Sequence, residues 1–269
     1  MVRPRPRRGA VPLNQLAEAY SDGAAAWADG PILVYRRLAE RLVAFSPVPL
    51  EGRRVLDLGS GTGEGSRAAL AAGARVIATD LAAEMLRVGR AGRPPSTAGD
   101  AVALPFRHDS FDVVLAPFSL NHLDDPADGV REAGRTGRLL LASTHAADDD
   151  HPAKAAVEIA LGESGWERPP WYSKLKVSMA AWGTVEQARA VVERGGLDPV
   201  LIERHEIELA DLGPRDMVAW RMGLAQSAAF VAALSADDRE RVVARALHLL
   251  GPDPVPVVPR VIFVACEGR

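Results

Sequence analysis

The chain has 269 residues, of which 48% are hydrophobic and 25% are charged, and its formal net charge is −3 at pH 7. This length can bury a sizeable core, either as one large α/β domain or as a domain with a cap. The balanced charge argues against nucleic acid as the main partner, and no apolar run approaches the roughly 20 residues of a membrane-spanning helix. The single cysteine, Cys266, excludes an intramolecular disulfide, and its apolar neighbours predict a buried strand residue.

The N-terminal region starts with a basic tail and continues with two helical patterns. Residues 1–12 carry four arginines interleaved with prolines and no aromatic residue, which predicts a disordered tail. No apolar segment of the signal-peptide type follows them, so we expect a cytoplasmic protein. Residues 13–28 and 31–45 have apolar side chains near helical spacing, and Pro47 and Pro49 end the second helix.

Residues 55–63, which read VLDLGSGTG, predict a buried strand that runs directly into a glycine-rich turn. The apolar run at the start suits a strand that is covered on both faces. Gly59, Gly61 and Gly63 allow a tight turn and a close approach of the backbone to a ligand, because glycine lacks a Cβ atom. A helix is expected over residues 64–72.

A second strand ends on an acid. Residues 75–80, RVIATD, predict a short strand whose last residue, Asp80, lies 17 residues beyond Gly63. This is close to the spacing of a βαβ unit in which a carboxylate holds two ribose hydroxyls. The glycine turn and the acid are therefore two independent signals for a nucleotide-type ligand.

The spacing of the glycines distinguishes two types of ligand. A dinucleotide fingerprint requires Gly-x-Gly-x-x-Gly, but counting from Gly59 puts Glu64 at the third glycine, and counting from Gly61 puts Ser66 there. Glu64 also places negative charge in the first helical turn, where a pyrophosphate would bind. The sequence therefore favours a ligand without phosphates and disfavours a nicotinamide-dependent oxidoreductase.

Further strands and helices follow in the second half of the chain. Residues 111–115 and 138–143 predict strands, separated by a short helix over residues 126–133. Beyond them we expect a helix over residues 184–194, capped by Thr184, and strands over residues 200–209 and 257–266. Residues 214–250 are strongly helical and too long for a hairpin connection, so we predict a helical insertion over the strand ends that acts as a substrate lid.

Four segments, taken in order, resemble motifs of the class I S-adenosylmethionine-dependent methyltransferases, in particular the group that acts on small molecules. The segments are residues 57–63, Asp80 with Leu81, residues 99–106 and residues 111–123. The resemblance implies that the first segment surrounds the methionine end of the cofactor, Asp80 binds the ribose, Leu81 lies against the adenine and the third segment reads the adenine edge. The cofactor-binding residues implied in this way are Asp57, Gly59, Ser60, Gly61, Gly63, Asp80, Leu81, Asp100, Ala101, Ala116 and Pro117.

The resemblance also implies the fold and its division. We expect a Rossmann-like α/β fold with a mostly parallel seven-stranded sheet, N-terminal helices and a helical insertion before the last strand. Within one domain over residues 13–269, the expected parts are a helical cap (13–50), a cofactor-binding half (51–145), a substrate half (146–212), a lid (213–252) and the last strand (253–269). The chain departs from the family where only Arg135-Thr136-Gly137 precedes the fifth strand, since a longer helix and a Pro-Gly-Gly turn are usual there.

Two histidines follow predicted strands, at the edge where open α/β sheets bind ligands. Methyl transfer to a hydroxyl benefits from a general base, and the pKa of histidine suits that role near neutral pH. His145 directly follows the fifth strand, and His122 occupies a position where the resembling group often has histidine, so both are candidate catalytic bases. For each, a hydrogen-bonded structural role is the alternative.

Two other patterns have competing interpretations. Residues 145–151, HAADDDH, combine histidines and acids, but three consecutive acids cannot all face one ion, so we expect an exposed helix start before Pro152 and no metal site. Aromatic residues in the substrate half and the insertion predict an apolar acceptor pocket, with core packing as the alternative for about half of them. These residues are Trp166, Trp171, Tyr172, Trp182 and Trp220, and Tyr20 and Trp27 of the N-terminal helices are candidates for the roof of the site.

The predicted function is methyl transfer from S-adenosylmethionine to a small organic molecule, with oxygen as the favoured acceptor atom and a secondary metabolite as the acceptor. The Asn-Pro-Pro-Tyr tetrad of nucleobase methyltransferases is absent at Ala116-Pro117-Phe118, so nucleic acid is not an expected partner, and neither is a membrane. A homodimer is allowed. The abundance of arginine and alanine indicates a GC-rich bacterial genome. The alternative is a protein of this fold that binds the cofactor structurally and performs a non-methylating reaction or binds a partner.

Overall fold

Seven strands form one sheet in the computed structural model, which describes residues 13–88 and 92–268. Their order is β3-β2-β1-β4-β5-β7-β6. The strands are β1 (Arg54–Leu58), β2 (Arg75–Asp80), β3 (Ser96–Ala98), β4 (Phe111–Pro117), β5 (Gly137–His145), β6 (Leu197–Glu206) and β7 (Arg260–Gly268). β7 runs opposite to the other six strands, so its pairings with β5 and β6 are antiparallel, whereas the other pairings are parallel. The predicted mostly parallel Rossmann-like sheet is confirmed, whereas the predicted tail over residues 1–12 lies outside the described residues.

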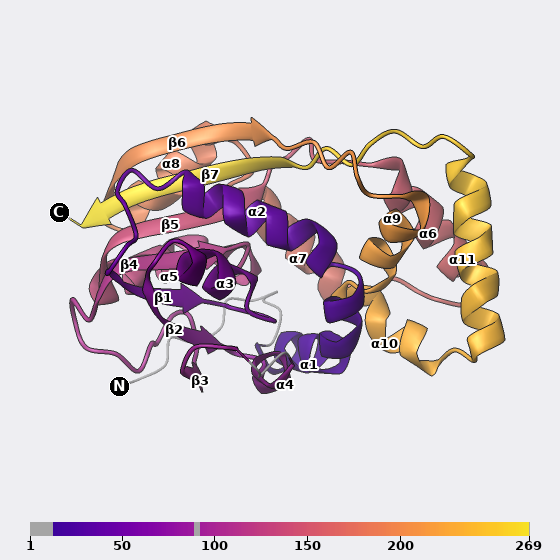
Figure 1. The fold of residues 1–269 in the computed structure, drawn as a ribbon, viewed down its shortest axis with the longest axis horizontal. Coiled ribbons are helices and arrows are strands. Elements are labelled where there is room, and N and C mark those ends of the chain that lie inside the picture. The colour runs from indigo at the N-terminus through magenta and orange to yellow at the C-terminus, as the bar shows by residue number, and fades with distance from the viewer. Residues whose placement is uncertain (1–12, 89–91, 269) are drawn as a thin grey trace.

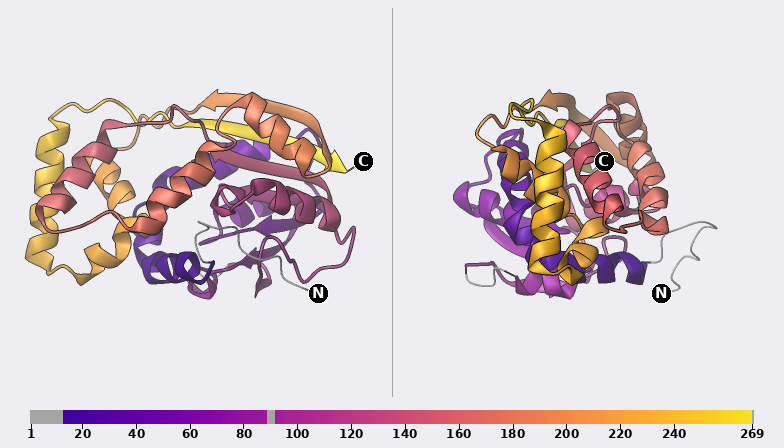
Figure 2. Two further views of the ribbon diagram at one scale, coloured as in Figure 1. Left: turned by 180° about the vertical axis from the view of Figure 1, so that it is seen from behind. Right: turned by 90° about the vertical axis from the view of Figure 1, so that its right-hand side faces the viewer.

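Helices cover both faces of the sheet, which is why its central strands read as nearly continuous apolar runs. One face packs against α2 (Ile32–Ala44) and α3 (Glu64–Ala71), and the other against α5 (Pro126–Thr136) and α8 (Val185–Arg194) (Figures 1 and 2). Side chains alternate between the two cores along each strand, so that in β5 Leu141 faces α2 and Leu140 faces α5.

The ends of these helices follow from local capping. α8 begins with a capping box in which the Thr184 hydroxyl accepts from the Gln187 amide at 3.2 Å and the Gln187 side chain accepts from the Thr184 amide at 3.1 Å. The predicted start at Thr184 is thus confirmed. α5 continues to Thr136 and joins β5 at Gly137 without a loop, so the predicted end of this helix at residue 133 is wrong. Gly134 stays helical and lies close to Leu197.

A group of four helices lies beyond the carboxyl ends of the parallel strands (Figures 1 and 2). It consists of α6 (Pro152–Glu163), α9 (Pro214–Met222), α10 (Ala225–Ala233) and α11 (Ala236–Leu250), with a small apolar core of its own. We call it the helical lobe. The predicted insertion over residues 214–250 is therefore three helices, interrupted at Gly223 and at Ser235, whose hydroxyl accepts from the Asp238 amide at 3.1 Å and starts α11.

The N-terminal helices, α1 (Leu13–Asp29) and α2, connect the lobe to the sheet. The turn between them packs directly on the backbone of α9: a Cβ atom at Gly30 would lie 2.1 Å from the carbonyl oxygen of Ala219. Likewise, a Cβ atom at Gly223 would lie 2.5 Å from Cδ of Pro31. The helical lobe therefore packs closely against the turn between α1 and α2, because Gly30 and Gly223 have no side chain that would prevent this contact.

Three elements were not expected from the sequence. They are α4 (Ala83–Arg87), β3 and α7 (Pro170–Ala180). The helix start expected before Pro152 is confirmed, since α6 begins there with His151 as its N-cap. The strand β3 has only three residues, all exposed, and α4 has five, so neither carries a readable hydrophobic period. α7 lies at the carboxyl end of the sheet, close to the single helical turn η1 (Leu120–His122) that follows β4.

Candidate active site

The glycine loop after β1 turns sharply before α3 begins. Gly59, Gly61 and Gly63 have φ values of 68°, 51° and 102°, a left-handed conformation that favours glycine. Gly59 also lies against the chain that follows β4, since a Cβ atom there would be 2.3 Å from Cβ of Ser119. The loop thus brings backbone amides to the carboxyl edge of the sheet, as the sequence predicted.

Asp80, at the end of β2, fixes the glycine loop through hydrogen bonds to backbone amides. Its Oδ2 accepts from the Gly61 amide at 2.7 Å and its Oδ1 accepts from the Ala82 amide at 2.8 Å. Burial raises the pKa of Asp80, and these amides counteract part of that effect by stabilising the carboxylate. Because each carboxylate oxygen has further lone pairs, Asp80 retains capacity to accept hydrogen bonds from a ligand.

Asp57 is a fully buried acid in β1, two residues before Gly59 of the glycine loop. Its Oδ2 accepts from the Ser66 hydroxyl at 2.6 Å, whereas Oδ1 has no hydrogen-bond partner among the described residues. Burial raises the pKa of Asp57 from 3.8 to about 6, and the bond from Ser66 opposes this rise. A buried carboxylate oxygen without a donor is costly, so a ligand that supplies a donor here would stabilise the fold.

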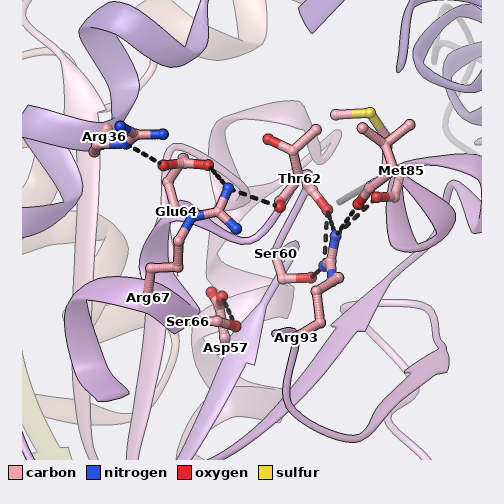
Figure 3. A network of polar contacts seen from close by, with 11 residues as sticks. Arg36, Asp57, Ser60, Thr62, Glu64, Ser66, Arg67, Met85 and Arg93 are labelled. Atoms are coloured by element: carbon pink, nitrogen blue, oxygen red, sulfur yellow. Dashed lines mark hydrogen bonds and ion pairs between the residues drawn. The ribbon is translucent and has the colours of Figure 1, made fainter. Parts of the chain in front are cut away.

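Arginines that the sequence analysis missed support the loop (Figure 3). The Arg93 guanidinium donates to the Gly61 and Met85 carbonyls at 2.9 and 2.8 Å and to the Ser60 hydroxyl at 3.0 Å. Its positive charge also favours ionisation of Asp57 and Asp80. Arg93 lies outside any of the recognised motifs, so only the folded chain brings it to the loop.

Glu64, the first residue of α3, is buried between two further guanidinium groups. Arg36 donates to it at 3.0 Å, and Arg67 forms a second ion pair (Figure 3). Its charge is therefore compensated. The exclusion of a pyrophosphate rests on the glycine spacing rather than on free negative charge at Glu64.

One cavity of about 400 Å³ runs from the glycine loop to the helical lobe. Most of the predicted cofactor residues line it, namely Asp57, Gly59, Ser60, Gly61, Asp80, Leu81, Asp100, Ala101 and Pro117. Gly63 caps the start of α3 and Ala116 is fully buried in β4, and neither is part of the cavity wall. Asp100 bends the chain locally, because its Oδ1 accepts from the Val102 amide at 3.1 Å.

His122 lies at this cavity with both ring nitrogens engaged. Nδ1 lies 3.2 Å from the Ser119 carbonyl oxygen, an acceptor, so this nitrogen carries the proton. Nε2 then accepts from the Tyr20 hydroxyl at 2.8 Å. Burial lowers the pKa of His122 to about 4, which keeps the ring neutral at physiological pH.

His145, the last residue of β5, lies between an acid and a phenol. Nδ1 is 3.0 Å from Oδ2 of Asp149, and Nε2 is 3.2 Å from the Tyr35 hydroxyl. Asp149 is in turn fixed by the Arg260 amide, which donates to its Oδ1 at 2.8 Å. Burial raises the pKa of Asp149, but His145, the Arg260 amide and the charge of Arg221 together outweigh this effect, so the net shift is downward and the carboxylate stays charged. The sequence analysis found His145 but missed Tyr35 and Asp149 as its partners.

Aromatic side chains line the part of the cavity beyond the glycine loop. The Tyr35 ring lies 5.0 Å from Trp27 and 5.2 Å from Phe118, measured between ring centroids. Of the predicted aromatic residues, those in the cavity wall are Tyr20, Trp27, Trp171, Tyr172 and Trp220. Trp182 is fully buried in the core under α8, and Trp166 packs in the helical lobe, with Nε1 donating to the Gln226 carbonyl at 3.2 Å. Some of the predicted aromatic residues therefore line the pocket, and Trp166 and Trp182 pack in the protein interior instead.

The three consecutive acids after His145 have separate partners. Asp148 pairs with Arg204 at 2.9 Å, Asp149 contacts His145, and Asp150 pairs with Lys154 at 3.2 Å. Among residues 13–88 and 92–268, no group of three or more histidine, cysteine or acidic side chains is placed to hold a metal ion.

Comparison with known proteins identifies the family. A family profile described as a methyltransferase domain matches residues 56–138. A demethylmenaquinone methyltransferase of Mycolicibacterium vanbaalenii is 30% identical over 176 residues, which cover 62% of this chain and 75% of that protein. A demethylmenaquinone methyltransferase of Renibacterium salmoninarum is 40% identical over 108 residues, 38% of this chain and 46% of that protein, so the match spans about half its length.

A solved structure supports the same fold. One chain of the complex between the Haloferax volcanii Trm112 methyltransferase activator and a methyltransferase aligns with a TM-score of 0.58, 21% identity and coverage of 93% of this chain and 97% of that chain. The sheet and the glycine-loop site define an α/β enzyme that uses S-adenosylmethionine. The chain belongs to the class I S-adenosylmethionine-dependent methyltransferases.

The residues at the glycine loop fit this cofactor. Asp57 offers an unpartnered carboxylate oxygen, the loop has no Cβ atoms at its turns, and Asp80 faces the same cavity. This donor set is acidic, which suits a cation with ribose hydroxyls and an amine better than a phosphate. None of the described helices is both long and apolar enough to cross a bilayer.

Proposed function

We propose that this methyltransferase acts on a hydroxyl oxygen of a small aromatic molecule bound between β5, α7 and α9. The observation that carries the proposal is the continuous cavity that contains both the glycine loop and the His145–Tyr35 pair. The rings around the far end of the cavity suit a flat aromatic acceptor. The names of the curated relatives refer to a quinone, which is likewise a flat ring compound.

For the cofactor, we assign Asp80 to the ribose hydroxyls, the glycine loop and Asp57 to the methionine end, and Asp100 with Ala101 to the adenine. Their shared position on one cavity wall supports these assignments. When bound, S-adenosylmethionine supplies a methyl group on a positively charged sulfur. The protein's main task is then to align the acceptor oxygen and exclude water.

For the acceptor proton, we assign His145 as the general base, with Tyr35 between it and the acceptor. Asp149 orients the ring so that the Nε2 lone pair faces the Tyr35 hydroxyl. Burial raises the pKa of Tyr35, so the phenol stays neutral. As the acceptor O–H breaks, Tyr35 takes that proton and passes its own to Nε2, and the net change is an imidazolium stabilised by Asp149.

His122 has a different role in this proposal. Its Nε2 lone pair is already used by Tyr20, and its lowered pKa makes it a weak base. We therefore assign it as a positioning residue that holds Tyr20 over the cavity. Substitution of His122 is expected to change acceptor affinity more than the proton-transfer step.

The experiment is a methylation assay that detects S-adenosylhomocysteine and product by mass spectrometry across a panel of aromatic hydroxy compounds. We expect at least one phenol or hydroxynaphthalene to be methylated on oxygen. His145→Ala should lower kcat by about 10²–10⁴-fold, the range typical of a general base, and leave S-adenosylhomocysteine affinity unchanged. His108→Ala, an exposed histidine outside the cavity wall, is the matched control. Full activity of His145→Ala on the methylated compound would refute the assignment of the base.

A further inference from the structure

The charged residues of the cavity wall are divided between its two ends. The acids at the cofactor end are Asp57, Glu64, Asp80 and Asp100, and the described part of the chain contributes no lysine or arginine to that wall. The cations are all at the other end, and they are Lys154, Lys176 and Arg221. All three cations of the wall thus lie at the end that receives the acceptor, together with Asp149 and Asp150, whereas the charged residues of the wall at the cofactor end are acids.

The acids at the acceptor end do not neutralise all three cations. Asp150 pairs with Lys154 at 3.2 Å, and Asp149 is engaged by His145 and the Arg260 amide. No ion pair joins Arg221 to any carboxylate of the described residues, in contrast to the arginines around the glycine loop. Positive charge therefore remains uncompensated where the acceptor binds.

Arg221 is held in a conformation that suits anion binding. It lies on α9, half-buried, with its guanidinium carbon 5.2 Å from the centroid of the Trp220 ring. Stacking on an aromatic face leaves the N–H groups at the edge of the guanidinium free, and their planar fork matches a carboxylate. The electrostatic effect of Arg221 reaches both Tyr35 and Asp149, so it lies near the catalytic groups.

Lys176 adds a second positive charge at the same end. It lies on α7, with Nζ 5.8 Å from the centroid of Tyr172. Burial lowers the pKa of Lys176, and the neighbouring charge of Lys154 lowers it further. A bound anion would relieve this repulsion between like charges.

We propose that the acceptor carries a carboxylate besides the hydroxyl that is methylated, and that Arg221 binds this carboxylate. The acceptor class is then an aromatic hydroxy acid. This inference rests on the proposed function, because it assumes that the aromatic end of the cavity receives the acceptor. Arg221 determines specificity, and Lys176, on α7, contributes less because a single ammonium group lacks the planar fork of a guanidinium.

The test measures binding by calorimetry to the full chain saturated with S-adenosylhomocysteine. The probes are 1-hydroxy-2-naphthoate, its methyl ester and 1-naphthol, which share one ring system and differ in charge. We expect the acid to bind at least about tenfold more tightly than the ester or the naphthol, as a charge-assisted bidentate contact implies. Equal affinity for the acid and the ester would overturn the proposal without any variant.

Variants test whether Arg221 causes the preference for the acid. Arg221→Gln should reduce the preference for the acid at least about fivefold, Arg221→Lys should retain part of it, and Arg189→Gln, on the exposed surface of α8, should leave it intact. Unchanged S-adenosylhomocysteine affinity shows that each variant is folded. If the preference survives Arg221→Gln, Arg221 is not the binding residue. Preferential binding of the acid without methylation would refute the proposed function and leave carboxylate binding by Arg221 standing. Methylation of neutral compounds alone would refute the preference for an acid and leave the proposed function standing.

Discussion

Asp80 is the residue on which the cofactor assignment depends most directly. Its carboxylate already accepts two backbone amides, so it is positioned before any ligand arrives. Such a fixed acceptor loses little side-chain entropy on binding. The same contacts shape the glycine loop, which links the ligand-binding role to the local structure.

We predict that Asp80→Ala weakens S-adenosylmethionine binding by roughly 10²-fold or more, because hydrogen bonds to a charged group contribute about 1.5–3 kcal/mol each. Titration calorimetry measures this. Asp112→Ala is the control: that acid pairs with Arg54 at 3.1 Å and is not part of the cavity wall. Equal affinity of the wild type and Asp80→Ala would contradict the assignment.

Asp57 should give the stability of the protein a recognisable pH dependence. Its pKa is raised from 3.8 to about 6, so the folded protein holds this proton more tightly than the unfolded chain does. The free energy of unfolding therefore falls as pH rises through this window, by at most about 3 kcal/mol at about 1.4 kcal/mol per pKa unit. We predict that Asp57→Asn removes this fall and is stabilising, relative to the wild type, more at about pH 7 than at about pH 4.

Urea denaturation at the two pH values measures the difference between Asp57→Asn and the wild type. Asp112→Asn provides a control of opposite sign, because hydrogen bonds from Arg54 lower the pKa of Asp112. Its effect should be small, since the pair is largely exposed and solvent screens it. A parallel pH dependence of Asp57→Asn and the wild type would show that the pKa of Asp57 is the same in the folded and unfolded states, which contradicts the raised value.

At the scale of elements, the position of the helical lobe depends on close backbone packing between α9 and the turn that joins α1 to α2. A methyl group at Gly30 would meet the Ala219 carbonyl oxygen at 2.1 Å, so α9 must move. We predict that Gly30→Ala destabilises the protein by about 1–3 kcal/mol, as overpacking usually does. It should also weaken acceptor binding more than cofactor binding, because α9 carries Trp220 and Arg221.

Thermal denaturation and calorimetry separate these two effects. Gly162→Ala is the matched control: this glycine lies in α6 with nothing within 4 Å of the added methyl group. It should be neutral or stabilising by up to about 1 kcal/mol through helix propensity. If Gly30→Ala binds acceptor and cofactor with the affinities of the wild type, packing at Gly30 does not affect acceptor binding through α9, and the prediction is wrong.

The sequence predicted elements well where they carry a period or a turn signal. The capping box at Thr184 and the strand before Gly59 are examples, since their local chemistry decides them. The helix α7 was not predicted, because its buried residues Trp171 and Leu175 pack against α1 and α10 and also line the cavity, which leaves no single amphipathic face. The break of the insertion at Gly223 depends on packing against Pro31, which no local pattern reveals.

The residues of the site likewise fall into those that could be predicted from the sequence and those that could not. Motif residues such as Asp57 and Asp80 could be found because their spacing along the chain is fixed by the βαβ unit. Arg93 and Tyr35 could not, since each reaches the site through a long-range contact with a residue of another element, and Asp149 could not because the Arg260 amide of β7 fixes it there. The charge division of the cavity also becomes visible only once α6, α7 and α9 are placed in space.

At the scale of the whole molecule, ligand binding should couple the sheet to the lobe, because the cavity wall includes both. We predict that saturating S-adenosylhomocysteine raises Tm by several degrees, since a ligand at 100 times its Kd stabilises by about 2.7 kcal/mol. Differential scanning calorimetry measures the shift, and amide hydrogen exchange should slow in the glycine loop and in α9. Protection confined to the loop would indicate that the lobe does not sense the cofactor.

The place of β7 in the sheet has a consequence for biosynthesis. β6 hydrogen-bonds only to β7, and β7 is also the neighbour of β5 on its other side. On the ribosome, β5 and β6 emerge earlier than the strand that must separate them. One edge of β5 therefore stays open, and β6 has no neighbouring strand, until β7 has left the exit tunnel, so a nascent chain stalled before Arg260 should be prone to edge-to-edge aggregation.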